Sequence, residues 1–336
     1  MGNKCCYISP DNKMFDKEII KRPDIVVPRK ASKAMCSKET YDSQKNTKQT
    51  SENSELLSSE RSEFDLQLLG IPKSRILEEI FIREGPFDFY VCQYPEGIQV
   101  ENLDFIKAGE SPMSKVYVST DTEGRTTKYL GEWNGDMREG RGIQVTLNNP
   151  AEGDQPSSDI AFIYEGYWLN DLAHGKGRLI HQDGDVYKGS WEKGKASGYG
   201  DYIHSDGTKY EGSWKDDLQD GQGKEYWVDG SMYQGQYKQG CKHGQGKFIW
   251  SDSSVYQGEF NMNIIEGKGI YRWPDGRIYN GSWSNNKMDG IGTYKWPDGR
   301  VYEGLWHKSL QHGAGKYSEP NGEEIKTLYQ FGKRVR

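Results

Sequence analysis

A repeat of 23 residues constrains this chain more than any other feature of its sequence. The pattern Tyr-x-Gly-x-aromatic starts at seven tyrosines at this fixed interval: Tyr164, Tyr187, Tyr210, Tyr233, Tyr256, Tyr279 and Tyr302. An eighth copy starts at Tyr129, 35 residues before Tyr164, and we place its extra residues at about 148–159, where Ser, Pro and acidic residues gather. One such unit cannot bury its own apolar face, so stability is expected to come from stacked neighbours.

Both halves of the repeat have the alternation of a β-strand. In the unit that starts at Tyr187, the side chains of Tyr187, Gly189 and Trp191 share one face, and a Gly-x-Gly pair follows at Gly198 and Gly200. A period of two predicts strands rather than helices. An Asp-Gly dipeptide near the end of most units supplies the positive φ angles of a tight hairpin turn. Because glycine weakens a strand, we expect a ring from the neighbouring strand to lie over each one.

The predicted fold class is therefore all-β: an elongated single-layer antiparallel sheet of tandem β-hairpins. Only 34% of residues are hydrophobic, but the chain has 41 glycines, 22 tyrosines and 10 tryptophans. In a sheet this thin, aromatic rings supply most of the buried area. The residues expected to hold the repeats together are Tyr129, Gly131, Trp133, Tyr164, Gly166, Trp168, Tyr187, Gly189, Trp191, Tyr210, Gly212, Trp214, Tyr233, Gly235, Tyr237, Tyr256, Gly258, Phe260, Tyr279, Gly281, Trp283, Tyr302, Gly304 and Trp306.

These units resemble MORN repeats, whose family pattern is Tyr-x-Gly-x-Trp, then Gly-x-Gly, then Asp-Gly. Tyr237 and Phe260 replace the tryptophan, and Ser253 replaces the turn glycine. The predicted domains are a disordered basic arm, a short helical segment, degenerate N-terminal cap strands, eight MORN repeats and a degenerate C-terminal cap. They span residues 1–61, 62–84, 85–128, 129–324 and 325–336, respectively.

The N-terminal sequence Met-Gly-Asn-Lys-Cys-Cys is typical of a lipid anchor. Gly2 suits N-myristoylation, and Cys5 and Cys6 suit S-palmitoylation, although the myristoylation pattern prefers Ser or Thr in place of Cys6. Two lipid signals hold a protein on a membrane more stably than one. The alternative is an ordinary N-terminus with incidental cysteines.

The arm is basic and the rest of the chain is acidic. Residues 1–50 contain 11 Lys or Arg and 6 Asp or Glu, a net of +5, so with a total of −6 the remainder carries −11. Lysine and arginine in the arm are expected to attract an anionic membrane, and the acidic remainder argues against a nucleic-acid partner. The residues expected to meet the membrane are Lys4, Lys13, Lys17, Lys21, Arg22, Arg29, Lys30 and Lys33.

The sequence favours a non-enzymatic, membrane-associated scaffold that binds protein partners. No catalytic or metal-binding constellation stands out, and no cofactor is expected. We expect a lipid-anchored protein on the cytosolic side of a membrane, and resemblance to MORN proteins implies the plasma membrane, endomembranes, the cell cortex or the cytoskeleton. The alternatives are a phosphoinositide-binding module and a regulatory subunit of a separate enzyme such as a lipid kinase.

The ring-rich face suggests where a partner binds. Even if wholly helical, residues 62–84 could cover only about 35 Å of that face. Rings near the C-terminus should therefore form an exposed strip for an amphipathic helix of a partner or for a second copy of this chain. The rings of the predicted groove are Tyr271, Trp273, Tyr294 and Trp296.

Overall fold

The computed structural model describes residues 69–71, 75–85, 87, 116–120, 125–148 and 160–335. They fall into two compact units, one within residues 31–218 and one within residues 219–336. The lipidation motif, the basic arm and residues 149–159 of the predicted insertion lie outside the described residues.

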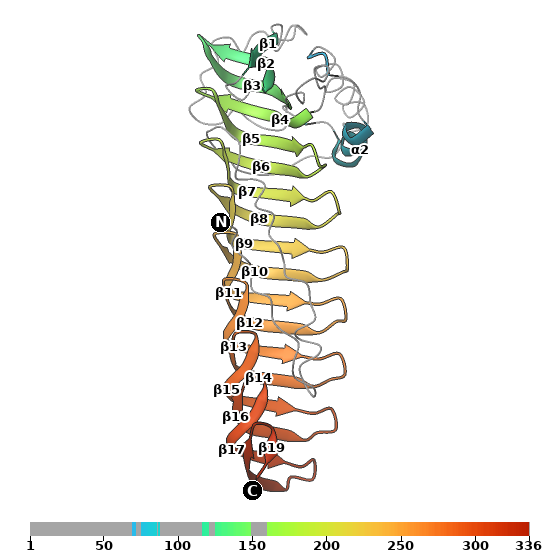
Figure 1. The fold of residues 1–336 in the computed structure, drawn as a ribbon, viewed down its shortest axis with the longest axis vertical. Helices are drawn as coiled ribbons and strands as arrows, with labels where there is room; N and C mark the ends of the chain where they lie inside the picture. Colours follow the sequence, from blue (N-terminus) through green and yellow to red (C-terminus); the bar gives the residue numbers. More distant parts are fainter. Residues whose placement is uncertain are drawn as a thin grey trace, which may run out of the picture. The chain divides into compact units, whose positions relative to one another are not determined.

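The predicted all-β class and the hairpin sheet are confirmed. Within each unit, strands that follow one another in sequence pair antiparallel, as Figure 1 shows. No helix of the described part is long and apolar enough to cross a membrane.

The unit within 31–218 has one described helix and eight described strands. They are α2 (Arg75–Glu84), β1 (Val116–Thr120), β2 (Thr126–Asn134), β3 (Met137–Leu147), β4 (Ile160–Leu169), β5 (Leu172–His181), β6 (Val186–Glu192), β7 (Lys195–Ile203) and β8 (Lys209–Lys215). The second unit contains β9 (Leu218–Tyr226), β10 (Met232–Lys238), β11 (Cys241–Ile249), β12 (Val255–Asn261), β13 (Ile264–Arg272), β14 (Ile278–Ser284), β15 (Lys287–Lys295), β16 (Val301–His307), β17 (Leu310–Ser318), β18 (Glu324–Gln330) and β19 (Lys333–Arg334).

Two kinds of turn alternate along the sheet. The tight one has two residues with positive φ, such as Lys193 (φ 52°) and Gly194 (φ 75°) between β6 and β7, which is the pattern of a type I′ hairpin turn. The Asp-Gly dipeptide lies in the longer turn, where the Gly207 amide donates to the His204 carbonyl at 2.9 Å. Only its glycine has a positive φ, so the expectation that Asp-Gly forms the tight turn is wrong. The aspartate instead accepts a backbone amide, as Asp206 does from Thr208 at 2.8 Å.

The two glycines of the Gly-x-Gly pair have different backbones. In the hairpin of β6 and β7, Gly189 is opposite Gly200 and Trp191 is opposite Ala196, with a register shift between the two pairs. The residues that this shift adds to β7 include Gly198, whose φ is +83°. Side chains disfavour that conformation, so the backbone rather than a ring requires this first glycine. A positive φ recurs at Gly140, Gly175, Gly221, Gly244, Gly267, Gly290 and Gly313.

Helix α2 ends at a glycine in the left-handed conformation. Gly85 has a φ of +67°, and its amide donates to the Phe81 carbonyl at 2.9 Å, as expected for a glycine that terminates a helix. Glu78 in the first turn and Arg83 in the last turn complement the helix dipole. The local sequence thus explains where this helix ends.

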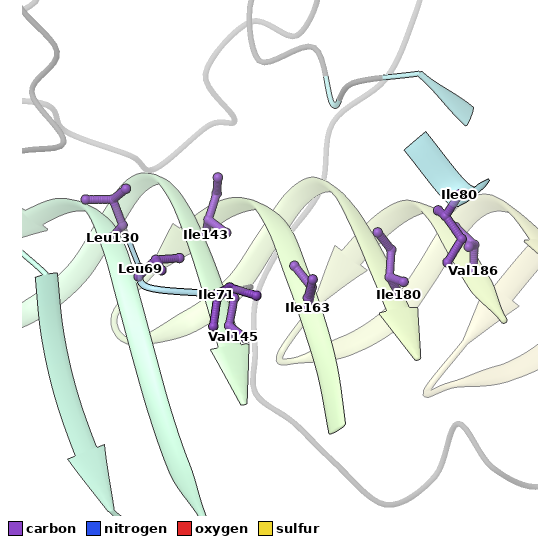
Figure 2. Packing of buried hydrophobic residues seen from close by; sticks show 9 residues of the cluster. All are labelled: Leu69, Ile71, Ile80, Leu130, Ile143, Val145, Ile163, Ile180 and Val186. Atoms are coloured by element: carbon purple, nitrogen blue, oxygen red, sulfur yellow. The ribbon is translucent and has the colours of Figure 1, made fainter. Parts of the chain in front are cut away.

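Helix α2 packs on the sheet face opposite the repeat tyrosines. Figure 2 shows Ile80 of α2 beside the strand residues Ile180 and Val186, and Ile71 near Val145. The buried cluster consists of Leu69, Ile71, Ile80, Leu130, Ile143, Val145, Ile163, Ile180 and Val186. The strand residue Leu130 follows Tyr129, and neighbouring side chains in a strand point to opposite faces.

Our expectation that the segment 62–84 covers the ring-rich face is therefore wrong for its described part. The physical reason is that β2–β6 gather aliphatic side chains on the opposite face, which gives α2 an apolar surface there. A buried ion pair extends this contact: Arg178 binds Glu165 at 2.7 Å, and its Nη1 donates to the Gly85 carbonyl at 2.5 Å.

Replacing Ile80 with Ala should destabilise the unit within 31–218 by roughly 2–4 kcal/mol, because it leaves a cavity between helix and sheet. The matched control is Ile82→Ala on the same helix, since Ile82 is 85% exposed and Ile80 only 2% exposed. Denaturant unfolding of both variants measures the difference. Equal losses would show that α2 does not dock through this face.

Candidate binding surface of the repeats

Repeat tyrosines within each unit lie edge-on between two aromatic rings. Tyr279 meets Trp283 of its own repeat at 5.2 Å and 87°, and Trp306 of the next repeat at 5.4 Å and 79°. In the other unit, Tyr187 contacts Trp191 at 5.1 Å and 90° and Trp214 at 5.2 Å and 81°. Edge-to-face aromatic pairs contribute about 0.5–1.5 kcal/mol each beyond their buried area. The contacts therefore link successive hairpins within each unit.

The same tyrosine covers two glycines that face each other across the hairpin. Gly281 pairs with Gly292, and a methyl group added at Gly281 would lie 2.5 Å from both the Tyr279 Oη and the Gly292 Cα. The Tyr279 hydroxyl donates to the Ser282 carbonyl at 2.9 Å, at the register shift between β14 and β15. The ring thus fits only because Gly281 and Gly292 have no side chains. Its hydroxyl supplies a hydrogen-bond donor where the backbone pairing of β14 and β15 is interrupted.

Replacing Gly281 with Ala should cost about 1–3 kcal/mol, since the methyl group overpacks the space under the Tyr279 ring. Asn280→Ala is the control, because Asn280 is the preceding residue of the same strand and is exposed; its effect should stay within about 0.5 kcal/mol. Urea unfolding compares the two. If both variants unfold at the wild-type midpoint, the ring does not require the glycine pair.

A second series of rings runs through the unit within 219–336. Tyr271 lies 4.6 Å from Trp273, Trp273 lies 5.4 Å from Tyr294, and Tyr294 lies 4.6 Å from Trp296. The whole series is Trp227, Phe248, Trp250, Tyr271, Trp273, Tyr294, Trp296 and Tyr317. It contains all four residues of the predicted partner groove.

These rings do not form the open strip that we expected. Tyr271 and Tyr294 are each 1% exposed and Trp273 is 5% exposed, while Trp296 is half-buried. They cover one another, and arginines cover them further, with Arg277 Cζ 5.2 Å from the Trp273 ring. The exposure was overestimated because a sheet with one ring-rich face can hide its rings by stacking them. A partner at these residues stays a prediction.

Two repeats place a cation among the rings, nine residues after the repeat tyrosine. The Arg138 guanidinium lies 4.2 Å from the Trp168 ring, and its Nε donates to Asp171 Oδ1 at 3.1 Å. The Lys242 ammonium lies 4.9 Å from the Trp227 ring and binds Glu225 at 2.6 Å.

Both cations thus combine aromatic walls with a carboxylate, which is the chemistry that favours a cation away from water. Burial lowers the pKa of Lys242, and the nearby Glu225 opposes that shift.

The repeat that starts at Tyr187 has alanine at the same position. Ala196 lines a small, partly open pocket together with Leu179, His181, Tyr187, Trp191, Tyr202, Trp214 and Asp217. Asp217 Oδ1 accepts the Ala196 amide at 2.7 Å. Burial raises the pKa of Asp217 to about 6, against the smaller opposing effects of this hydrogen bond and of Lys195. We call this space the Ala196 pocket.

The raised pKa of Asp217 makes its effect on stability dependent on pH. The pKa of Asp217 in the folded state lies above the ordinary value of 3.8, so folding favours the protonated carboxyl over the ionised carboxylate. The stability that the protonated carboxyl contributes is present below about pH 4 and is lost as the pH rises from about 4 to above 6. Asparagine can make the same contact, as Asn263 does with the Lys242 amide at 2.8 Å. Asp217→Asn should therefore raise the melting temperature at pH 8 and leave it nearly unchanged at pH 4. A gain that is the same at both pH values would contradict the burial of this carboxylate.

Sequence reasoning missed Arg138, Lys242, Ala196 and Asp217. A signal exists, because a comparison of the repeats at the ninth residue after the tyrosine finds basic residues in only two of the eight. The predicted lipidation and membrane-contacting residues lie outside the described part of the chain, so the structure does not bring them together with any site. In the described part, no group of three or more His, Cys, Asp or Glu residues is arranged to hold a metal ion.

Consecutive hairpins with a tyrosine over a glycine pair define a tandem hairpin-repeat protein. The MORN repeat family model matches residues 129–145, 164–186, 187–209, 210–232, 233–255, 256–276, 279–299 and 302–324. The chain belongs to the MORN-repeat proteins.

No curated protein matches the sequence. Among solved structures, the chain is similar to the SAS-4 (dCPAP) TCP domain of Drosophila melanogaster in complex with a proline-rich motif of Ana2 (dSTIL), with 12% identity, 66% of this chain and 94% of that chain covered, and a TM-score of 0.20. A streptogramin B lyase structure has 12% identity, 67% and 72% coverage, and a TM-score of 0.15. TM-scores this low carry no argument about fold or function.

Proposed function

We propose that this protein is a non-enzymatic scaffold that binds protein partners at a cytosolic membrane surface. The observation that carries the proposal is the run of MORN repeats over residues 129–324. Such an array uses its rings to join hairpins and offers partners regular rows of side chains. One row in the unit within 219–336 follows directly after the repeat tyrosines and includes the exposed residues Gln234, Gln257, Asn280 and Glu303.

The sequence of the N-terminus supports the membrane part of the proposal. Gly2, Cys5 and Cys6 together suit a myristoyl chain and one or two palmitoyl chains. A single myristoyl chain binds a membrane only marginally, and a second lipid or a basic segment makes the attachment stable. The arm contains basic residues such as Lys13. Each basic residue that is held near an anionic leaflet adds attraction of about 1 kcal/mol.

Gly2→Ala should move the full-length protein from the membrane fraction to the soluble fraction, because the substitution removes the myristoylation site. Cys5→Ser with Cys6→Ser should leave a weak association that high salt releases, since only one lipid and the basic arm remain. Cell fractionation with a high-salt wash measures both. A Gly2→Ala protein that stays membrane-bound through the wash would disprove the anchor.

The lipid-binding alternative is tested with unacylated full-length protein and vesicles that contain phosphatidylinositol 4,5-bisphosphate. If only the arm contacts lipid, changing to Gln the eight basic residues that are expected to meet the membrane should abolish sedimentation with the vesicles. These are Lys4, Lys13, Lys17, Lys21, Arg22, Arg29, Lys30 and Lys33. Undiminished sedimentation of this variant would assign lipid binding to the repeats instead.

A further inference from the structure

We propose that the Ala196 pocket binds a lysine or arginine side chain of a protein partner. This inference rests on the proposed role in protein binding and specifies its chemistry. The pocket lies on the ring-rich face of the unit within 31–218, and residues from three consecutive repeats line it.

The chain itself shows what this position of the repeat can hold. Ala196, Arg138 and Lys242 each lie nine residues after their repeat tyrosine. Arg138 and Lys242 place their own cation among aromatic rings, at 4.2 Å from the Trp168 ring and 4.9 Å from the Trp227 ring. Alanine has no side chain beyond Cβ, so residue 196 supplies no cation of its own to the pocket beside it.

The carboxylate of the Arg138 site is also present in the Ala196 pocket. Asp171 Oδ1 accepts the Arg138 amide at 2.9 Å, and Asp217 Oδ1 accepts the Ala196 amide at 2.7 Å. In the first site, Asp171 also binds the Arg138 guanidinium at 3.1 Å. Among the described residues no ion pair forms at Asp217, and the nearby Lys195 binds Asp216 at 3.2 Å.

The walls of the pocket suit a cation as well. Trp214 lies 5.2 Å from Tyr187 and 6.1 Å from Tyr202, and all three rings are at most 7% exposed. The faces of such rings attract cations, and more strongly where water is excluded. Negative charge is close, since Asp185 Oδ2 accepts the Tyr202 hydroxyl at 2.8 Å.

Hydrogen bonding favours lysine or arginine over a quaternary ammonium group. Arg138 uses its donors on Gln144 Oε1 at 2.6 Å and on the Asp171 carbonyl at 2.8 Å, in addition to the carboxylate. A quaternary ammonium group, as in a choline headgroup, has no hydrogen to donate. The carboxylate of Asp217 is therefore used fully only by a guanidinium or a primary ammonium.

The first experiment titrates the full-length protein, with its tryptophans labelled with nitrogen-15, with n-butylguanidinium. The indole signals of Trp191 and Trp214 should shift, and Asp217→Asn should weaken binding by about tenfold or more, because it removes a charged acceptor. The neutral analogue N-butylurea should bind at least tenfold more weakly. Equal binding of the neutral analogue, or no effect of Asp217→Asn, would overturn the proposal.

Tetramethylammonium tests the lipid-headgroup source. It should bind more weakly than n-butylguanidinium and should be less sensitive to Asp217→Asn. If it binds at least as tightly, the partner-side-chain inference is overturned in favour of a choline-type ligand. These outcomes are independent of the Gly2→Ala fractionation, so failure of this pocket and failure of the proposed membrane scaffold can be told apart.

The second experiment fills the pocket from within. Ala196→Arg should recreate the Arg138 site, raise the melting temperature and abolish binding of n-butylguanidinium. The matched control is Ala173→Arg, since Ala173 holds the same repeat position but Gly194 stands where the carboxylate of Asp217 would be needed. If the two variants have the same melting temperature and Ala196→Arg still binds the probe, the correspondence with Arg138 is wrong.

Discussion

The packing of one tyrosine ring over a pair of glycines is the interaction on which this sheet depends. At Tyr279 the ring covers Gly281 and Gly292, and its hydroxyl reaches the Ser282 carbonyl at 2.9 Å. The ring also lies between two tryptophans of successive repeats. One tyrosine side chain therefore packs on the paired glycines, hydrogen-bonds a backbone carbonyl where the strand pairing is interrupted, and stacks against the next repeat. This concentration explains how a sequence with only 34% hydrophobic residues can hold its strands together.

The repeat pattern predicts the strands and the ring-over-glycine contact because both follow from spacing within 23 residues. It does not separate the two glycines of the Gly-x-Gly pair. Gly198 has a φ of +83°, whereas Gly200 has the Tyr187 ring against it. Both requirements select glycine, so a glycine in the sequence does not reveal whether the backbone conformation or the packing of a ring requires it.

Features that vary between repeats were harder to predict. The docking face of α2 depends on Ile143, Val145 and Ile163, at positions that the 23-residue pattern does not specify. The Ala196 pocket was harder still to predict, because the residue that marks it is an alanine at the repeat position where Arg138 and Lys242 have long cationic side chains. It becomes meaningful only beside Arg138, since the structure places Asp171 and Asp217 in the same contact with the backbone.

The buried pair of Lys242 and Glu225 also addresses a problem that every tandem array shares. Hairpins that share one repeat pattern could pair with the wrong neighbour and still stack their rings. Lys242 and Glu225 are 1% and 5% exposed, and a preceding hairpin other than the native one would offer a residue such as Tyr202 in place of Glu225. An uncompensated buried charge costs about 3–5 kcal/mol. The repeat that contains Lys242 can thus specify which hairpin pairs with it. Correct pairing there keeps the order of the hairpins in the sheet the same as their order along the chain.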